Sequence, residues 1–404
     1  MENPARSNKA LVHGTLAFAT TFAIWGLLSG LMPILKKDLA LTASQASLLV
    51  AAPVMVGSLG RIPAGILADR FGGKRVMAAI LFLVTLPALL LGLAKGYDAY
   101  IAVATLLGIA GTSFSVGITL VSRWFPPSKQ GTSLGIYGAG NFGQSVAVFG
   151  APALASVFGL TAAIWTFAAA SLVYAVVFAR SAEDAPWNQP RKSFAEQARL
   201  LFSNWRCWTL SWLYFQTFGG FVALSIYMPM LLKELFALSP SDAGFRTAMF
   251  VVLATICRPL GGYLSDRLNA SHILVFVFNG LVPCAFMMTS PDLGYFTIGA
   301  LGAAALVGLG NGAVFKLVPH YFPKDVGTVT GLVGAAGGLG GFFPPLVLGY
   351  CRDHLGTYNF GFYCLAAFAI ACLLVLYITV RERQPAAKDM GGEELPVILT
   401  VTEN

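Results

Sequence analysis

One stretch of the sequence combines an intramembrane charge with a tight turn: residues 57–75 read GSLGRIPAGILADRFGGKR. Its apolar first part predicts a helix that contains Arg61 and ends near Asp69 and Arg70, where Gly72 opens a turn. Arg61 lies eight residues before Asp69, which is about 12 Å along a helix and well inside a membrane's hydrocarbon layer. A charge at that depth is costly unless it faces a cavity or a ligand.

The same layout returns later in the chain: residues 254–272 read ATICRPLGGYLSDRLNASH. Arg258 again lies eight residues before an acid, Asp266, which is followed by Arg267. Ionisable residues inside apolar spans mark functional sites by default. The repeated arginine therefore indicates a site for an anion.

Composition limits the chain to a membrane protein. Of its 404 residues 56% are hydrophobic and only 11% are charged, and apolar runs of about twenty residues, enough to cross a bilayer, appear along nearly its whole length. Such runs are too long for barrel strands, so helices are expected. The net charge of +8 is explained by loop lysines and arginines, so the lipid bilayer and not nucleic acid is the expected partner. The six cysteines form no close pair, and we expect no metal and no cofactor.

Hydropathy and loop signals predict twelve transmembrane helices. Lysine and arginine concentrate in the loops on one side, which predicts a multi-pass protein of the cell inner (plasma) membrane with both termini cytoplasmic. The expected spans are residues 13–35, 44–68, 76–94, 99–122, 131–155, 160–180, 207–232, 244–264, 272–290, 294–318, 327–350 and 357–380.

Internal similarity predicts a duplicated six-helix unit. The arginine-to-aspartate element recurs at an offset of 197 residues, and so does WFP at 124–126 against YFP at 321–323. The fold class is therefore an all-α membrane protein with two pseudo-symmetric six-helix halves. We expect an N-terminal half at 1–180, a cytoplasmic linker at 181–206, a C-terminal half at 207–381 and a disordered cytoplasmic tail at 382–404.

The loop GILADRFGGKR at 65–75 resembles a motif of the major facilitator superfamily, and GYLSDR at 262–267 is its half-repeat. The second copy departs after Arg267, where LNAS replaces the glycines and basic residues. The resemblance implies the major facilitator fold and assigns these loops to conformational gating. A glycine-rich part of the eleventh span is also expected to bend during gating. The expected gating residues are Gly65, Asp69, Arg70, Gly72, Asp266, Arg267, Gly337 and Gly338.

Within that superfamily the chain looks like the nitrate/nitrite porters over essentially all twelve spans. The likeness rests on Arg61 and Arg258 together with GAGNFG at 138–143 and GAAGGLGGFF at 334–343. It extends to GNGAVFKLVPHYFP at 310–323. The resemblance implies nitrate and nitrite as partners, with Asn141 as a hydrogen-bond donor and the aromatic residues beside the anion. The substrate-binding set is then Arg61, Arg258, Asn141, Phe114, Tyr214 and Phe218.

The residues alone leave alternatives. An intramembrane arginine can pair with a buried carboxylate, but all eighteen acids fall in loops, tails or span ends, which favours the substrate site. Planar guanidinium forks suit a planar oxyanion, although phosphate would fit the charge too. Asn141 can instead bridge to a neighbouring helix, and the aromatic residues can be ordinary packing.

The sequence also allows two mechanisms that drive transport, nitrate/proton symport and nitrate/nitrite antiport. Lys316 snorkels to the interface, forms a second contact with the anion, or titrates. Its surrounding sequence resembles family members assigned to uptake by nitrate/proton symport. Two uncompensated arginines instead favour nitrate/nitrite antiport, because closing the empty carrier desolvates like charges. We expect symport and a monomer. Another facilitator, for a different small anion or an organic phosphate, is a further alternative, whereas no catalytic motif indicates an enzyme.

Overall fold

A computed structural model describes residues 4–186, 193–238 and 240–381, and every regular element in these ranges is helical. The first group of helices is α1 (Pro4–Asp38), α2 (Ala43–Phe71), α3 (Gly73–Leu91), α4 (Gly96–Leu107), η1 (Gly108–Thr112), α5 (Ser113–Ser122), η2 (Pro127–Lys129), α6 (Gln130–Gly138), η3 (Ala139–Asn141), α7 (Phe142–Phe158) and α8 (Leu160–Ser181). The later helices are α9 (Phe194–Ser203), α10 (Trp205–Tyr214), the π-helical turn η4 (Phe215–Gly219), α11 (Gly220–Phe236), α12 (Pro240–Arg267), α13 (Ala270–Met287), α14 (Leu293–Tyr321), α15 (Val326–Leu355) and α16 (Asn359–Arg381).

Ten helical stretches within the described ranges are long and apolar enough to cross a membrane. The other two expected spans, 131–155 and 207–232, are also helical, but each is interrupted: α6 continues through η3 into α7, and α10 continues through η4 into α11. The prediction of an all-α membrane protein is confirmed. What the sequence did not reveal is that these helices change their winding in mid-membrane.

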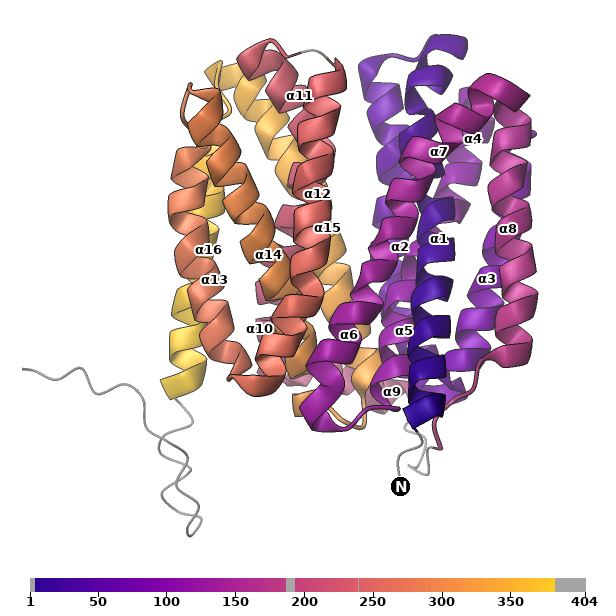
Figure 1. Cartoon of the computed structure of the whole chain (residues 1–404), viewed down its shortest axis with the longest axis vertical. Helices are drawn as coiled ribbons and strands as arrows, with labels where there is room; N and C mark the ends of the chain where they lie inside the picture. Colours follow the sequence, from indigo (N-terminus) through magenta and orange to yellow (C-terminus); the bar gives the residue numbers. More distant parts are fainter. Residues whose placement is uncertain (1–3, 187–192, 239, 382–404) are drawn as a thin grey trace, which may run out of the picture.

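The helices form two groups that lie side by side, α1 to α8 in one and α10 to α16 in the other (Figure 1). The groups contact each other mainly through α2 with α15 and α6 with α12. We call the end of the molecule where α1 begins the amino-terminal side. The expected boundaries of the two halves stay a prediction. Residues 187–192 of the expected linker and the expected tail, 382–404, lie outside the described residues.

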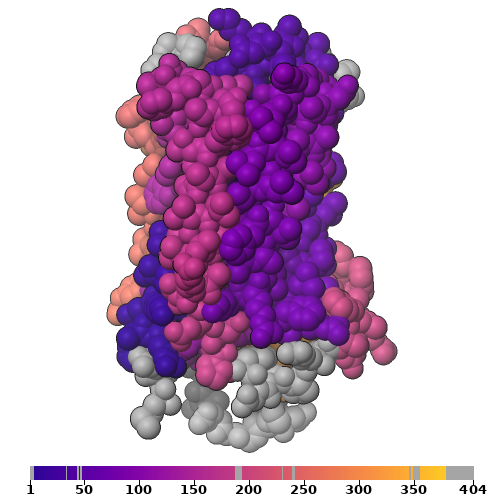
Figure 2. Space-filling view, turned by 90° about the vertical axis from the view of Figure 1, so that its right-hand side faces the viewer, coloured from indigo at the N-terminus to yellow at the C-terminus, as the bar shows by residue number. Residues whose placement is uncertain are grey.

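Helices α3 and α8 form the outer face of the first group (Figure 2). Both helices carry exposed apolar side chains. Leu83, Leu86 and Val173 are 58%, 61% and 66% exposed. Such a continuous apolar surface would be unfavourable in water, whereas lipid tails cover it without cost. The buried apolar core lies inside each group and between the two groups.

Gly72 makes the link between α2 and α3. Its φ of +94° is a conformation that side chains with a Cβ rarely adopt. A single residue therefore reverses the chain direction between Phe71 and Gly73, which places Asp69 at the amino-terminal side directly beside the second helix group.

Candidate functional site

Two buried arginines lie where the helix groups meet. Arg61 on α2 is 1% exposed and Arg258 on α12 is 2% exposed. The Nε atom of Arg61 donates to the carbonyl of Gly111 at 3.0 Å, and one terminal nitrogen donates across the interface to the carbonyl of Gly334 at 2.7 Å. Arg258 donates to the Tyr214 hydroxyl at 3.2 Å. Among the described residues neither arginine pairs with a carboxylate, so two positive charges are held by neutral acceptors alone.

The two arginines face the same aromatic rings. The guanidinium carbon of Arg61 is 5.3 Å from the ring centroid of Phe114 and 5.6 Å from that of Phe218. The corresponding distances for Arg258 are 5.2 and 5.9 Å. Cation–π attraction therefore offsets part of the cost of burying both charges.

The rings themselves form a narrow slot. Phe114 comes from α5 of the first group and is nearly parallel to Phe218 of η4, with centroids 6.2 Å apart and planes 9° apart. Tyr214 is parallel to Phe114 as well, at 6.3 Å and 5°. A planar ion between two rings needs about 7 Å, twice a carbon contact of roughly 3.5 Å. The gap between near-parallel rings is at most their centroid distance, so insertion requires these rings to separate by at least about 1 Å.

Irregular turns carry or adjoin the site residues. The 3₁₀ turn η1 directly precedes α5, which carries Phe114; η3 ends at Asn141; and the π turn η4 contains Phe218. Such turns alter the carbonyl-to-amide register of a helix and often mark functional positions. The carbonyl that accepts from Arg61 belongs to Gly111 in η1. Two of the three interrupted helices therefore contribute to the arginine site, one through Gly111 and Phe114 and the other through Tyr214 and Phe218.

Two glycines make room for the guanidinium groups. A Cβ on Gly138 would overlap the side chain of Arg258, and one on Gly334 would lie 3.1 Å from Cδ of Arg61. Both glycines begin the glycine-rich stretches noted in the sequence, 138–143 and 334–343. At these two positions the absent side chain serves the arginines directly.

Asn141 lies apart from the arginine contacts. It is 8% exposed and lines a cavity of about 430 Å³ on the side opposite the amino-terminal side. The cavity lies between the two groups, with Ser29 and Gln144 on one wall and Ser225 and Thr247 on the other. In the described residues no hydrogen bond joins Asn141 to either arginine. The structure thus brings five of the six expected substrate residues together and places the sixth in the wall of this cavity.

Sequence reasoning missed Phe315 on α14. Its ring meets Phe114 edge-on at 5.0 Å and Tyr214 edge-on at 4.6 Å, and the guanidinium carbon of Arg258 lies 6.0 Å from its centroid. Phe315 closes the aromatic cluster from the side of α14. The only signal was its position in the stretch 310–323, next to Lys316.

Tyr137 was missed as well. Its hydroxyl donates to the carbonyls of Ser113 at 3.2 Å and Phe114 at 3.1 Å, and its ring stacks on Phe18 at 5.0 Å. These contacts hold the first turn of α5, which carries Phe114. Tyr137 is therefore a positioning residue for the slot.

Two further polar side chains are buried close by. Thr217 in η4 is fully buried and Asn311 on α14 is 3% exposed, and the side-chain oxygen of each has no hydrogen-bond partner among the described residues. Asn311 lies one turn before Phe315 on the same helix. The neighbourhood of the slot thus holds polar groups that the aromatic pattern alone does not reveal.

A latch on the amino-terminal side joins α2 to α15. The Asp69 carboxylate accepts from the backbone nitrogens of Gly327 and Thr328 at 3.0 and 2.7 Å and from the Thr328 hydroxyl at 2.9 Å. Arg123 donates to it at 2.8 Å, and both charged side chains are almost fully buried. The carboxylate therefore satisfies free N–H groups at the start of α15 and complements the helix dipole.

The second acid forms the matching latch between α12 and α6. Asp266 accepts from the backbone nitrogens of Gly131 and Thr132 at 2.8 and 2.7 Å and from the Thr132 hydroxyl at 2.7 Å. Lys316 donates to Asp266 at 2.6 Å and also to the carbonyl of Pro127. Lys316 thus takes the place that Arg123 has in the first latch, a contact that no sequence reading of this lysine included.

Arg70 and Arg267, which follow the latch acids, point to aromatic rings. The guanidinium carbon of Arg70 is 4.5 Å from the centroid of Phe194 on α9, and that of Arg267 is 4.5 Å from Tyr263. Residues of the expected linker therefore pack onto the first latch, and Gln197 of α9 also donates to Thr328 at 2.9 Å.

The expected gating glycines permit close helix contacts. A Cβ on Gly65 would overlap the carbonyl of Gly327, while Gly337 and Gly338 lie against side chains of α10 and α2. In this conformation α15 is one continuous helix through Gly337 and Gly338. Their expected bending stays a prediction.

Two bundles of membrane-crossing helices around a cleft with latches on one side define a transporter of the facilitator class. The chain belongs to the Major Facilitator Superfamily, whose sequence profile matches residues 14–318 and, in a second match, 214–402. Membership makes it a multi-pass membrane transporter and not an enzyme.

Among individual proteins, the chain is 38% identical over 383 residues to the "Nitrite extrusion protein" of Bacillus subtilis, covering 94% of this chain and 97% of that protein. It is 36% identical over 385 residues to the "Probable nitrate transporter NarT" of Staphylococcus epidermidis, covering 94% and 99%. It is 37% identical over 392 residues to the "Probable nitrate/nitrite transporter NarK2" of Mycobacterium tuberculosis, covering 94% and 98%.

Solved structures share the fold at lower identity. The human organic anion transporter TETRAN superposes with a TM-score of 0.78 at 17% identity, covering 93% of this chain and 100% of that chain. The proton:xylose symporter XylE superposes with a TM-score of 0.77 at 15% identity, covering 93% and 96%. These likenesses confirm the predicted major facilitator fold.

Proposed function

We propose that the chain transports nitrate and nitrite across the membrane, with the anion held between Arg61 and Arg258. One observation carries the proposal: two buried guanidinium groups share the same aromatic rings, and no carboxylate among the described residues neutralises either. Planar donor forks beside flat rings suit a small planar oxyanion. The names of the relatives, which mention nitrate and nitrite, support this choice of anion.

Alternating access follows from the arrangement around the slot. Both latches are made on the amino-terminal side, while a cavity lies between the groups on the opposite side. The anion would enter through that cavity past Asn141 and reach the arginines between Phe114 and Phe218. Rocking of the two groups would then break both latches and open the site to the amino-terminal side. We infer that this side faces the cytoplasm, that the membrane is the plasma membrane, and that the transporter works as a monomer.

For the coupling we propose nitrate/proton symport. Lys316 forms an ion pair with Asp266, and the pair must separate when the second latch opens. Separation changes the electrostatic surroundings of both groups, which is the condition for linking a proton to the conformational cycle. Lys316 thus has a geometry suited to the coupling role expected from the sequence.

Nitrate/nitrite exchange is the second candidate, because the arginines lack a carboxylate partner. Closing the cleft without an anion would bring two like charges into a medium of low dielectric constant, whereas a bound anion offsets them. Proteoliposome uptake of ¹⁵N-nitrate separates the two: symport requires an inward proton gradient and no internal anion, whereas exchange requires internal nitrite and ignores the gradient. The absence of any nitrate flux under both conditions would contradict the proposed function itself.

Replacing Lys316 tests the symport route. In Lys316→Gln the gradient-driven component of nitrate uptake is expected to disappear, because a neutral amide cannot form the ion pair with Asp266. Lys129→Gln, at an exposed lysine on the same side, is the matched control and should keep the full stimulation. Gradient-driven uptake of normal size in Lys316→Gln would exclude this lysine from coupling.

Gly138→Ala tests the fit of the slot. The new methyl group would displace the guanidinium of Arg258, and loss of about one charge-assisted hydrogen bond should raise the KM for nitrate roughly tenfold. Gly150→Ala is the control, because a Cβ there meets only Phe167 at an ordinary 3.7 Å. An unchanged KM in Gly138→Ala would mean that Arg258 does not contact the anion in its present position.

A further inference from the structure

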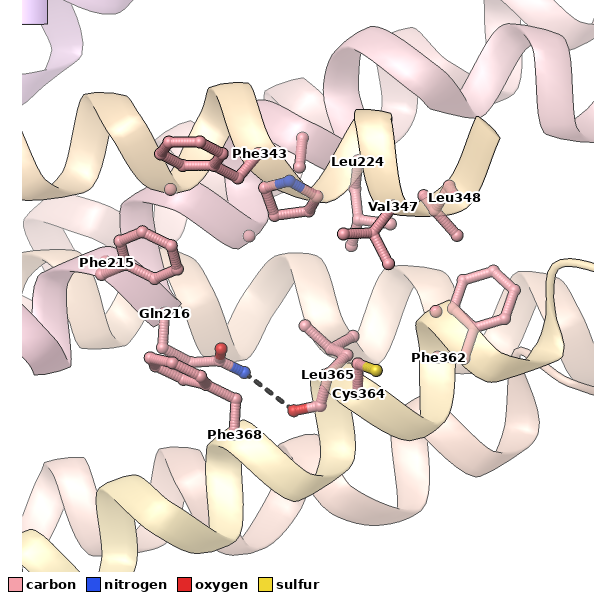
Figure 3. Close-up of a pocket in the computed structure, with 15 residues that line it drawn as sticks. Phe215, Gln216, Leu224, Phe343, Val347, Leu348, Phe362, Cys364, Leu365 and Phe368 are labelled. Atoms are coloured by element: carbon pink, nitrogen blue, oxygen red, sulfur yellow. Dashed lines mark hydrogen bonds between the residues drawn. The ribbon is translucent and has the colours of Figure 1, made fainter. Parts of the chain in front are cut away.

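A second cavity lies in the later helix group, between α11, α15 and α16 (Figure 3). Its volume is about 250 Å³. Leu224 of α11, Val347 and Leu348 of α15, and Leu365 of α16 point into it. It contains neither arginine, so it is separate from the anion site.

The mouth of this cavity opens between α15 and α16. Phe343 and Val347 are 49% and 41% exposed, and Cys364 on α16 is exposed as well. Phe343 and Cys364 belong to stretches that are apolar and long enough to cross the membrane, Val326–Pro344 and Asn359–Ile378. The mouth therefore faces the hydrocarbon layer of the bilayer and not the water on either side.

The chemistry of the walls selects an apolar occupant. Among the described residues that line the cavity, no side chain is charged and only Gln216 is strongly polar. Its amide nitrogen donates to the carbonyl of Leu365 at 3.0 Å (Figure 3). That hydrogen bond already engages the amide across the cavity wall. Hydrocarbon fits this space, whereas an anion or a lipid headgroup would lose its hydration without a compensating partner.

The inner wall is the same π turn that carries part of the anion site. Phe215 and Gln216 of η4 line the cavity, while Phe218 of η4 faces both arginines. Gly340 of α15 is in the wall too, and a Cβ there would come within 2.9 Å of the Cα of Gly219. Anything that fills the cavity therefore presses on the far side of the turn that must move when the aromatic slot widens.

We propose that one acyl chain of a membrane phospholipid binds in this cavity and braces η4 behind the anion site. A phospholipid is the source because the mouth lies at membrane depth, where its chains are the surrounding medium. The acyl chain enters between Phe343 and Cys364 and ends against Phe215 and Gln216. It supports the position of Phe218 and so makes transport sensitive to the acyl chains of the bilayer.

Photolabelling tests the binding directly and does not depend on the identity of the transported anion. The full chain is reconstituted with phosphatidylcholine that carries a diazirine near the end of one acyl chain, irradiated, and digested for mass spectrometry. Adducts are expected on the peptides that contain Leu224, Leu348 and Leu365. Adducts confined to outward-facing residues such as Leu83 and Val173 would show boundary lipid only and overturn the proposal.

A filled cavity provides the matched comparison. Gly220 lines the cavity, and a Cβ there meets Leu365 at an ordinary 3.8 Å, so Gly220→Leu adds its side chain to the space. The adducts should be lost in Gly220→Leu and kept in Gly150→Leu, and both variants should elute as the wild type on size exclusion. Retained cavity adducts in correctly folded Gly220→Leu would overturn the site. Labelling by a diazirine fatty acid but not by the phospholipid would overturn the choice of occupant.

The bracing role has its own readout. Wild-type and Gly150→Leu protein should change their nitrate uptake rate in parallel when dioleoyl lipids are replaced by branched diphytanoyl lipids, whereas Gly220→Leu should lose this response. An equal response of the wild type and both variants would contradict the bracing role, even if the acyl chain binds in the cavity. Failure of nitrate uptake in every lipid would instead contradict the proposed function. The labelling result would then still decide whether an acyl chain binds in the cavity.

Discussion

Nitrate uptake is expected to fall at least about 100-fold in Arg61→Ala and in Arg258→Ala. Each guanidinium can give an oxyanion two charge-assisted hydrogen bonds of about 1.5–3 kcal/mol, and a loss of about 3 kcal/mol corresponds to two powers of ten. The protein should still fold, because alanine removes a buried charge that no carboxylate in the described residues neutralises. Uptake into proteoliposomes and size exclusion of the purified variants measure the two effects separately.

The conservative replacements sharpen this test. Arg61→Lys and Arg258→Lys keep the charge but lose the planar fork, so they should restore only a small part of the uptake. Arg246→Ala is the matched control, since this arginine is partly exposed and pairs with Asp242 at 3.2 Å. Normal uptake by either alanine variant would remove that arginine from the substrate site, and full rescue by lysine would mean that charge alone selects the anion.

The broad features were predictable because they rest on local patterns. Apolar runs gave the helices, and Arg61 and Arg258 were visible as isolated charges in such runs. The latch acids were recognisable because Asp69 and Asp266 stand at corresponding helix ends. The contacts between the groups, α2 with α15 and α6 with α12, follow the same repeat.

The interruptions of the helices were not predictable from hydropathy. A π turn adds one residue to a helical turn, and in the stretch FQTFG at 215–219 this changes neither the length nor the apolar character of the span. Yet the turn decides which side chains face the arginines. The glycines of GAGNFG at 138–143 fit close helix packing, so they did not reveal η3.

Tertiary partners were also beyond the sequence. The pairing of Lys316 with Asp266 depends on how α14 packs against α12, and two long helices can slide past each other without changing their own patterns. The role of Phe315 could not be predicted either, because an aromatic residue in a span is interpreted as ordinary packing until its neighbours are known. Asn141 was grouped with the arginines through family resemblance, whereas its position in the cavity wall comes from the helix geometry.

The second large effect concerns the first latch: Asp69→Asn should shift the conformational equilibrium toward opening on the amino-terminal side by about two powers of ten. Asp69 and Arg123 form a buried pair at 2.8 Å, and removing one partner of such a pair costs about 3–5 kcal/mol. Asparagine can still accept a hydrogen bond from the start of α15, but it no longer compensates the charge of Arg123 or the helix dipole. The conformation with the latch made is therefore destabilised relative to the open one.

Distances between two spin labels, measured by double electron–electron resonance, report this shift. Spin labels at Lys129 and Lys324 report the amino-terminal side, because both positions are exposed and they belong to loops of different helix groups. In a background without other cysteines, Asp69→Asn should add a longer distance that the parent lacks. Asp98→Asn, at an exposed acid at the start of α4, is the control and should leave the distribution unchanged.

Because a carrier must visit both conformations in each cycle, the same substitution should also slow net uptake even though the anion site is intact. The KM for nitrate should change much less than the maximal rate, since Asp69 touches α15 far from the arginines and acts on the equilibrium between conformations. An unchanged distance distribution together with normal uptake would mean that the Asp69 latch is packing alone, and that the barrier to opening lies instead at Asp266 and Lys316.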